Sequence, residues 1–226
     1  MEEILAFEGI EYGYRDSRGY KTIIKNACGI FDNGRIYAVM GQAPDEKAAL
    51  LSLLSGLEKP DKGSILFKGA DIEGMGRDLF RRKHVGLLLQ AYPCLPRLSV
   101  LQNAMLSMDG CGGSRKELKR RIAGLLVQAG LEPAKNSRRA SGLSFMEQQA
   151  VSLVRALGPE PPLLLIEERD WDSDPGLGHG MAGLLHQAAY GRGACVIIAT
   201  NSRNLLDRAD EVWGMKQGIL LPLKTH

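Results

Sequence analysis

The sequence predicts an α/β fold with a mostly parallel β-sheet core, an N-terminal antiparallel β subdomain and an inserted helical subdomain. Short apolar runs alternate along the chain with segments of helical periodicity, as in α/β proteins. Most of these runs are continuous rather than alternating, which is typical of strands buried on both faces of a parallel sheet. Apolar residues make up 44% of the 226 residues, which is enough for a sizeable core.

The whole chain, residues 1–226, is expected to form a single domain, because its length suits one domain with a subdomain inserted. A net charge of +3 is too small to indicate a nucleic acid partner. No apolar run approaches the ~20 residues of a membrane-spanning helix. We therefore expect a cytoplasmic protein with no nucleic acid partner and no direct membrane insertion, so that any role at a membrane requires a partner.

The first elements are predicted to be two strands of an antiparallel flap, at residues 4–14 and 22–31. A buried strand at residues 35–40 follows. It leads into the segment GQAPDEKA at residues 41–48 and then into an apolar helix that ends near Gly56. This strand–loop–helix unit is the part of the sequence with the most specific pattern.

The middle of the chain, residues 76–143, shows helical patterns and no strong strand, so it is expected to be the helical subdomain. Its clearest helix covers residues 114–129, where Ser114 and Glu117 form a capping-box pair and Gly130 follows the end.

The last third continues the α/β pattern. A helix over residues 144–157 begins with a second capping-box pair, Ser144 and Glu147, and residues 211–223 are predicted to form a closing hairpin. Four runs are expected as inner strands of the parallel sheet: residues 35–40, 85–89, 163–166 and 195–199.

The strand–loop–helix unit carries the first sign of a known family. Gly41 and Lys47 have the spacing of the phosphate-loop pattern G-x-x-x-x-G-K-[ST]. Further landmarks follow in order: LPRLSVLQN at 95–103, LSFMEQQ at 143–149 and LLLIEE at 163–168. Together they resemble the ATP-binding subunit of ABC transporters over nearly the whole chain, especially the macrolide-export and lipoprotein-release group. The resemblance implies the P-loop NTPase-like ABC ATPase fold.

The resemblance also implies ATP and Mg²⁺ as ligands. It places Glu168 at the catalytic position, Asn201 where the switch histidine belongs, and Gln90 and Glu167 near the metal. Its implied partners are a membrane permease and a second ABC subunit, identical or different, which would hold the protein on the inner face of the cell membrane. The residues at nucleotide-binding positions are Tyr14, Gly41, Lys47, Gln90, Ser144 and Asp174.

The phosphate loop departs from the family pattern. Pro44 and Glu46 replace glycines whose N–H groups wrap the phosphates, and Ala48 replaces a hydroxyl that holds magnesium. Proline removes a donor, and Glu46 places a carboxylate where phosphate would lie. One interpretation is that Pro44, Asp45 and Glu46 start the helix and that their carboxylates satisfy its N-terminus. The other is neutral drift in an unused loop.

The signature segment and the catalytic strand are altered too. Ser144 is present, but Phe145 and Met146 replace glycines, and their bulk prevents close backbone approach. These two side chains form either an apolar patch for a partner or part of the core. Glu167 is one bond longer than the usual aspartate, and Asn201 cannot carry a proton as histidine does.

These losses predict a degenerate Walker A site and weak or absent ATP hydrolysis, that is, a pseudo-ATPase or regulatory subunit. Two alternatives remain open. The first is an active ATPase that drives export through a permease. The second is a soluble scaffold or regulator that keeps only the ABC fold. Turnover abolished by Glu168→Gln would favour the active ATPase, and a permease encoded nearby would argue against the scaffold.

Overall fold

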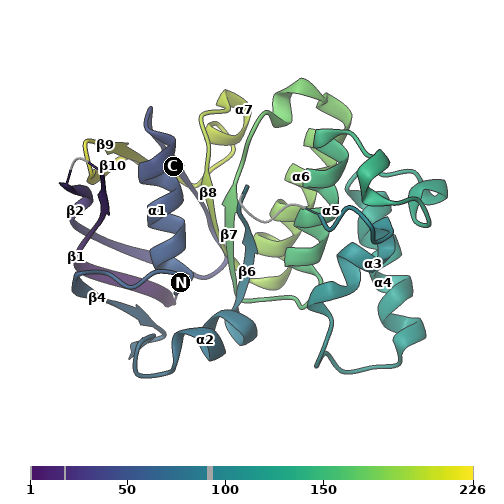
Figure 1. Cartoon of the computed structure of the whole chain (residues 1–226), viewed down its shortest axis with the longest axis horizontal. Coiled ribbons are helices and arrows are strands. Elements are labelled where there is room, and N and C mark those ends of the chain that lie inside the picture. The colour runs from purple at the N-terminus through teal and green to yellow at the C-terminus, as the bar shows by residue number, and fades with distance from the viewer. Residues whose placement is uncertain (1, 18, 91–93, 226) are drawn as a thin grey trace.

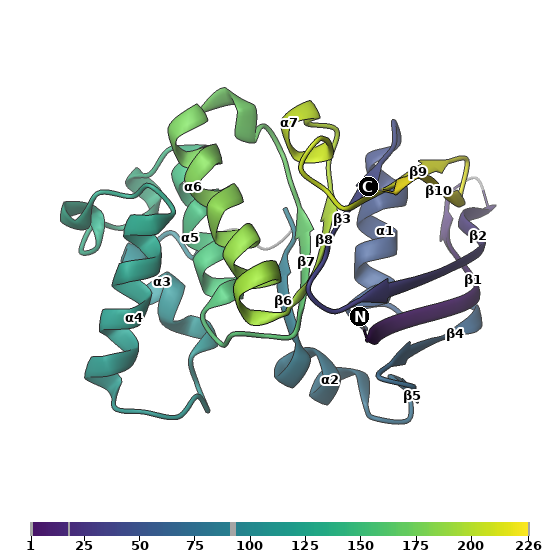
Figure 2. The same cartoon turned by 180° about the vertical axis from the view of Figure 1, so that it is seen from behind.

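The computed structural model describes residues 2–17, 19–90 and 94–225. Helix α1 (Pro44–Leu54) lies between two β-sheets, and helices α3 to α6 gather on the far side of the larger sheet (Figure 1). The reverse view in Figure 2 shows the same layers, with the N-terminal strands on the outer side of α1. The predicted fold class, an α/β core with an antiparallel N-terminal part, is confirmed.

The smaller sheet is antiparallel, with the strand order β2-β1-β4-β5. Strands β1 (Glu3–Asp16) and β2 (Gly19–Asp32) are the predicted flap. The sequence does not predict β4 (Lys62–Phe67), because Gly63 interrupts its short pattern. Gly63 has a φ of 80°, and a Cβ there would lie 2.4 Å from a backbone oxygen of β1, so glycine lets the two strands approach. The two-residue strand β5 (Ala70–Asp71) completes the sheet.

The larger sheet has the order β10-β9-β3-β8-β7-β6. Its strands β9, β3, β8, β7 and β6 are parallel, and β10 pairs with β9 in the antiparallel direction, as expected for the closing hairpin. The strands are β3 (Ile36–Met40), β6 (Val85–Leu88), β7 (Leu163–Glu167), β8 (Cys195–Ala199), β9 (Glu211–Lys216) and β10 (Ile219–Thr225).

Strand β6 corrects two expectations. It lies at the edge of the sheet, where it pairs with β7, so the expectation of an inner strand at residues 85–89 was wrong. It also lies inside residues 76–143, so part of the segment expected to be helical belongs to the parallel sheet. A division into a separate subdomain at these limits stays a prediction.

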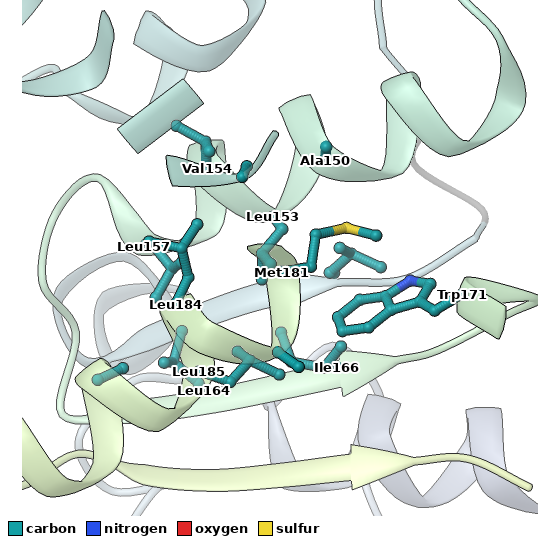
Figure 3. Close-up of a cluster of buried hydrophobic side chains, with 14 of the residues drawn as sticks. Ala150, Leu153, Val154, Leu157, Leu164, Ile166, Trp171, Met181, Leu184 and Leu185 are labelled. Carbon is teal, nitrogen blue, oxygen red and sulfur yellow. The ribbon is translucent and has the colours of Figure 1, made fainter. Parts of the chain in front are cut away.

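The inner strands are buried on both faces, which explains their continuous apolar sequences. In β7, Leu163 and Leu165 belong to the core that contains α1, whereas Leu164 and Ile166 belong to the core under α5 and α6. Figure 3 shows this second core, in which side chains of α5 and α6 pack over β7 beside Trp171.

The helices begin where their caps predict. Ser114 and Ser144 each accept a hydrogen bond from a backbone N–H of the first turn, and Glu117 and Glu147 complete both capping boxes. Residues 187–191 continue α6 as one π-helical turn. The remaining helices are α2 (Arg77–His84), α3 (Val100–Ala104), α4 (Arg115–Gln128), α5 (Phe145–Leu157), α6 (Pro175–His186) and α7 (Arg203–Leu206). Among the described residues, no helix has the length and apolar character needed to span a membrane.

Candidate functional site

A polar pocket of about 440 Å³ lies at the carboxyl ends of the parallel strands. This is the edge at which open α/β sheets bind their ligands. The pocket brings together several residues that the resemblance assigned to nucleotide, metal or catalysis: Lys47, Gln90, Glu167, Glu168 and Asn201.

The loop before α1 is held by the protein's own side chains. The backbone N–H of Gly41 donates to Asn201 Oδ1, and Asn201 Nδ2 donates to the Gly41 carbonyl, both at 3.1 Å. A Cβ on Gly41 would lie 2.6 Å from the carbonyl oxygen of Met215, so only glycine fits here. Asn201, at the switch-histidine position, therefore fixes the start of the phosphate loop. It also occupies the Gly41 N–H, a donor that could otherwise face a ligand.

Helix α1 begins at Pro44, as the proline and the two acids after it predict. Asp45 and Glu46 lie in its first turn, and the N-cap residue, Ala43, makes no side-chain cap hydrogen bond among the described residues, so the interpretation that the two carboxylates satisfy the helix N-terminus stays a prediction. Glu46 Oε1 accepts a hydrogen bond of 3.0 Å from the N–H of Gly218 in the β9–β10 turn. Asp45 forms an exposed ion pair with Lys21 at 3.7 Å. Glu46 thus ties α1 to the closing hairpin.

Lys47 points to the acidic end of β7. Burial lowers the pKa of Lys47, and the negative charges of Glu168 and Glu167 partly oppose that shift. Its anionic neighbours are therefore the two glutamates at the end of β7, across the pocket from α1. In this arrangement the ammonium group balances charge within the protein.

Both carboxylate oxygens of Glu168 already accept hydrogen bonds. Thr200 Oγ1 donates to Oε2 at 2.6 Å, and the backbone N–H of Trp171 donates to Oε1 at 2.9 Å. Thr200 has only one hydroxyl proton, and its oxygen in turn accepts from Ser202 N. These two hydrogen bonds fix the Glu168 carboxylate at the end of β7.

Gln90 and Glu167 are linked at the ends of β6 and β7. The backbone N–H of Gln90 donates to Glu167 Oε2 at 3.0 Å. Gln90 Oε1 accepts a hydrogen bond of 2.8 Å from Arg169, the residue just beyond the catalytic position. Sequence reasoning did not give Arg169 a role.

The other expected site residues lie outside this pocket. Tyr14 is 40% exposed on β1, with the Lys21 ammonium 5.9 Å from its ring centre. Asp174 caps α6, since its Oδ1 accepts from Leu177 N at 3.1 Å. Ser144 caps α5.

The two residues that replace the signature glycines have different surroundings. Phe145 is 49% exposed, whereas Met146 is 6% exposed and belongs to the core. Of the two interpretations, the core holds for Met146, while exposure leaves only Phe145 free to meet a partner.

Strand register explains which site contacts the sequence could have revealed. Glu167 lies opposite Ala199 in the parallel pair of β7 and β8, so the next residues, Glu168 and Thr200, leave the sheet side by side. That contact follows from aligning the two strands. The contact between Glu46 and Gly218 joins residues 172 positions apart and has no local signal.

Comparisons with known proteins agree with this geometry. Residues 24–169 match the model of the ABC transporter family. The chain is 32% identical over 222 residues to a lipoprotein-releasing system ATP-binding protein, LolD, of Cereibacter sphaeroides, covering 96% of this chain and 99% of that one. It is 29% identical over 224 residues to an uncharacterized ABC transporter ATP-binding protein of Mycobacterium tuberculosis, covering 98% and 90%.

Solved structures show the same fold. The ATP-binding cassette MJ0796, in a dimeric post-hydrolysis state bound to ADP and Pi, superposes with a TM-score of 0.90. The match covers 99% of this chain and all of that one, at 22% sequence identity. A second cassette, an ATP-binding subunit of an ABC transporter, superposes with a TM-score of 0.82 at 23% identity.

Proposed function

The chain belongs to the ABC transporter family, and we propose that it is a transporter's ATP-binding subunit in which ATP hydrolysis is weak or absent. The relatives named above are ATP-binding proteins, one of them from a lipoprotein-releasing system. Such a subunit acts with a membrane permease and a second ABC subunit. It therefore works at the inner face of the cell membrane without inserting into it.

The observation that carries the proposal is the contact of the Gly41 N–H with Asn201, at a loop whose glycines are also replaced. The Gly41 N–H donates to Asn201, position 44 has no N–H because it is proline, and a carboxylate stands at position 46. A hydrogen bond to a charged group contributes about 1.5–3 kcal/mol. Losing two of them weakens nucleotide binding on the order of a hundredfold or more.

The chemistry is weakened at the same pocket. A general base must lie within hydrogen-bond reach of the attacking water and accept its proton. Glu168 receives a hydrogen bond on each oxygen, from Thr200 and from the backbone of Trp171. These contacts hold the carboxylate to the protein, and Asn201, in place of the switch histidine, removes a group that could carry a proton, which supports slow hydrolysis even for bound ATP.

An active ATPase is the second candidate, and one observation favours it. Lys47, Gln90, Glu167 and Glu168 still line one pocket at the strand ends, the usual place for a ligand. The retained charge of Lys47 could hold phosphate once a partner subunit closes over it. This candidate predicts turnover that depends on Glu168.

ATP turnover by the purified protein separates the two candidates. We expect phosphate release in the presence of ATP and Mg²⁺ to be indistinguishable between the wild type and Glu168→Gln. The substitution removes the carboxylate and keeps the size of the side chain. Turnover that is clearly above background in the wild type and lost in Glu168→Gln would establish the active ATPase instead.

A further inference from the structure

Arg169 is the one cation in the pocket besides Lys47, among the residues that the structure describes as lining it. It follows Glu168 directly, at a position where the family usually has proline. Its Nη1 donates to Gln90 Oε1 at 2.8 Å. A guanidinium group has donors and no acceptor, so the atom that it contacts must be the amide oxygen rather than the amide nitrogen.

The contact extends to a third residue. The backbone N–H of Gln90 donates to Glu167 Oε2 at 3.0 Å. Strands β6 and β7 are neighbours in the sheet, so Gln90, Glu167 and Arg169 form one connected group across two strand ends. Arg169 therefore fixes the side chain of Gln90, while the backbone of Gln90 engages Glu167.

The residues at the positions where the family pattern places metal contacts do not fit a magnesium ion, although Glu168, Asp170 and Asp172 also line the pocket. Mg²⁺ requires oxygen ligands in nearly ideal octahedral geometry. At the three positions where the family pattern places metal contacts, Ala48 has no side-chain oxygen, Gln90 Oε1 accepts from a cation, and Glu167 Oε2 accepts from an N–H. A divalent ion on Gln90 Oε1 would also lie beside the positive charge of Arg169 and be repelled by it.

We propose that Arg169 is a positioning residue that keeps divalent metal ions off Gln90, by occupying Gln90 Oε1 with a charged hydrogen bond. This inference rests on the proposed function, since it concerns the same pocket. Gln90 then supplies no ligand to a magnesium ion that a nucleotide carries.

Binding of Mn²⁺ tests the proposal directly, because free Mn²⁺ gives a paramagnetic resonance signal that is lost when the ion binds. Mn²⁺ is titrated into the purified wild type, Arg169→Ala and Arg169→Lys, without nucleotide. We expect Arg169→Ala to bind Mn²⁺ at least about tenfold more tightly than the wild type. Arg169→Lys keeps the charge and is expected to behave as the wild type.

Further variants keep the test decisive. Adding Glu167→Gln to Arg169→Ala is expected to remove the gain, which places the ion in this pocket rather than on the surface. Arg169→Gln serves as a second uncharged variant if the alanine form does not fold. Equal Mn²⁺ binding by the wild type and both uncharged variants overturns the proposal, and so does a gain in Arg169→Lys as large as that in Arg169→Ala.

The outcome is distinguishable from that of the turnover assay. A wild type that hydrolyses ATP and excludes Mn²⁺ contradicts the proposed function and leaves the role of Arg169 standing. A wild type that binds Mn²⁺ tightly and does not hydrolyse ATP contradicts the role of Arg169 and leaves the proposed function standing.

Discussion

Asn201 joins two loops 160 residues apart through a pair of hydrogen bonds to Gly41. Each hydrogen bond contributes a net ~1 kcal/mol, less where water competes. We therefore predict that Asn201→Ala lowers the free energy of unfolding by about 1–2 kcal/mol, measured by urea denaturation. Asn201→Asp keeps the acceptor for the Gly41 N–H but turns a carboxylate oxygen toward the Gly41 carbonyl, so it should cost at least as much as alanine. Equal stability of the alanine variant and the wild type would show that the Asn201 contacts do not stabilise the loop.

Glu147 makes stability depend on pH on the acid side. Burial alone would raise its pKa, but hydrogen bonds from Lys135 Nζ and Ser144 N outweigh burial and hold the pKa below the usual 4.5. A carboxyl with a lowered pKa in the folded state stabilises the protein above its unfolded pKa, and this contribution is lost as the pH falls through the folded pKa.

We predict that the stability difference between the wild type and Glu147→Gln shrinks as the pH is lowered from about 6 to about 3. Denaturation curves of both proteins across this range measure it. A difference that stays constant over the range would mean that the charge of Glu147 contributes nothing to folding. Glu117→Gln, in the other capping box, is the matched comparison. Hydrogen bonds from Ser114 also lower the pKa of Glu117, so the same trend with pH is expected.

At the scale of elements, α6 shows where sequence patterns are insufficient. Its residues include four glycines, a composition that disfavours a helix, and no helix was predicted there. Two of these glycines are required by close packing of the helix against other backbone segments. A Cβ on Gly178 would lie 2.4 Å from the carbonyl oxygen of Trp171, and one on Gly180 would lie 2.7 Å from that of Gln128. Close tertiary packing thus overrides a poor helix propensity.

Two substitutions in α6 should have opposite effects. Gly183 has nothing within 4 Å of an added Cβ, so Gly183→Ala should stabilise the protein by up to about 1 kcal/mol through helix propensity. Gly180→Ala introduces a methyl group against a backbone oxygen and should destabilise it. Thermal unfolding of the two variants decides between packing and propensity, and stabilisation by both would refute the packing explanation.

The remaining elements were predictable to different degrees. Continuous apolar runs located β3, β7 and β8 to within one residue, and capping boxes located the starts of α4 and α5. The pattern did not reveal that β6 is an edge strand, because strand order depends on contacts between distant segments. The family motifs identified five residues that the structure places in one pocket: Lys47, Gln90, Glu167, Glu168 and Asn201. They could not show the hydrogen-bond partners of these residues or of Glu46. Arg169 donates to Gln90, Thr200 donates to Glu168, and Gly218 donates to Glu46.

For the whole molecule, the loss of the signature glycines bears on assembly. The family's nucleotide sites are composite, with the phosphate loop of one subunit facing the signature segment of another. Phe145 is 49% exposed at the start of α5, where a glycine would allow close approach. We predict that ATP does not change the molar mass of Glu168→Gln in light scattering, with or without Mg²⁺. A mass that doubles on adding ATP would show that the composite site still assembles.

The measurement that tests the central claim most directly is the calorimetric titration of ATP into the purified wild type, with Mg²⁺ and again with a chelator. In the phosphate loop the Gly41 N–H already donates to Asn201 and Pro44 has no N–H, so we predict no binding tighter than about millimolar in either condition. Micromolar binding that strengthens when Mg²⁺ is present would contradict the account, because it would mean that the altered loop still holds both phosphate and metal.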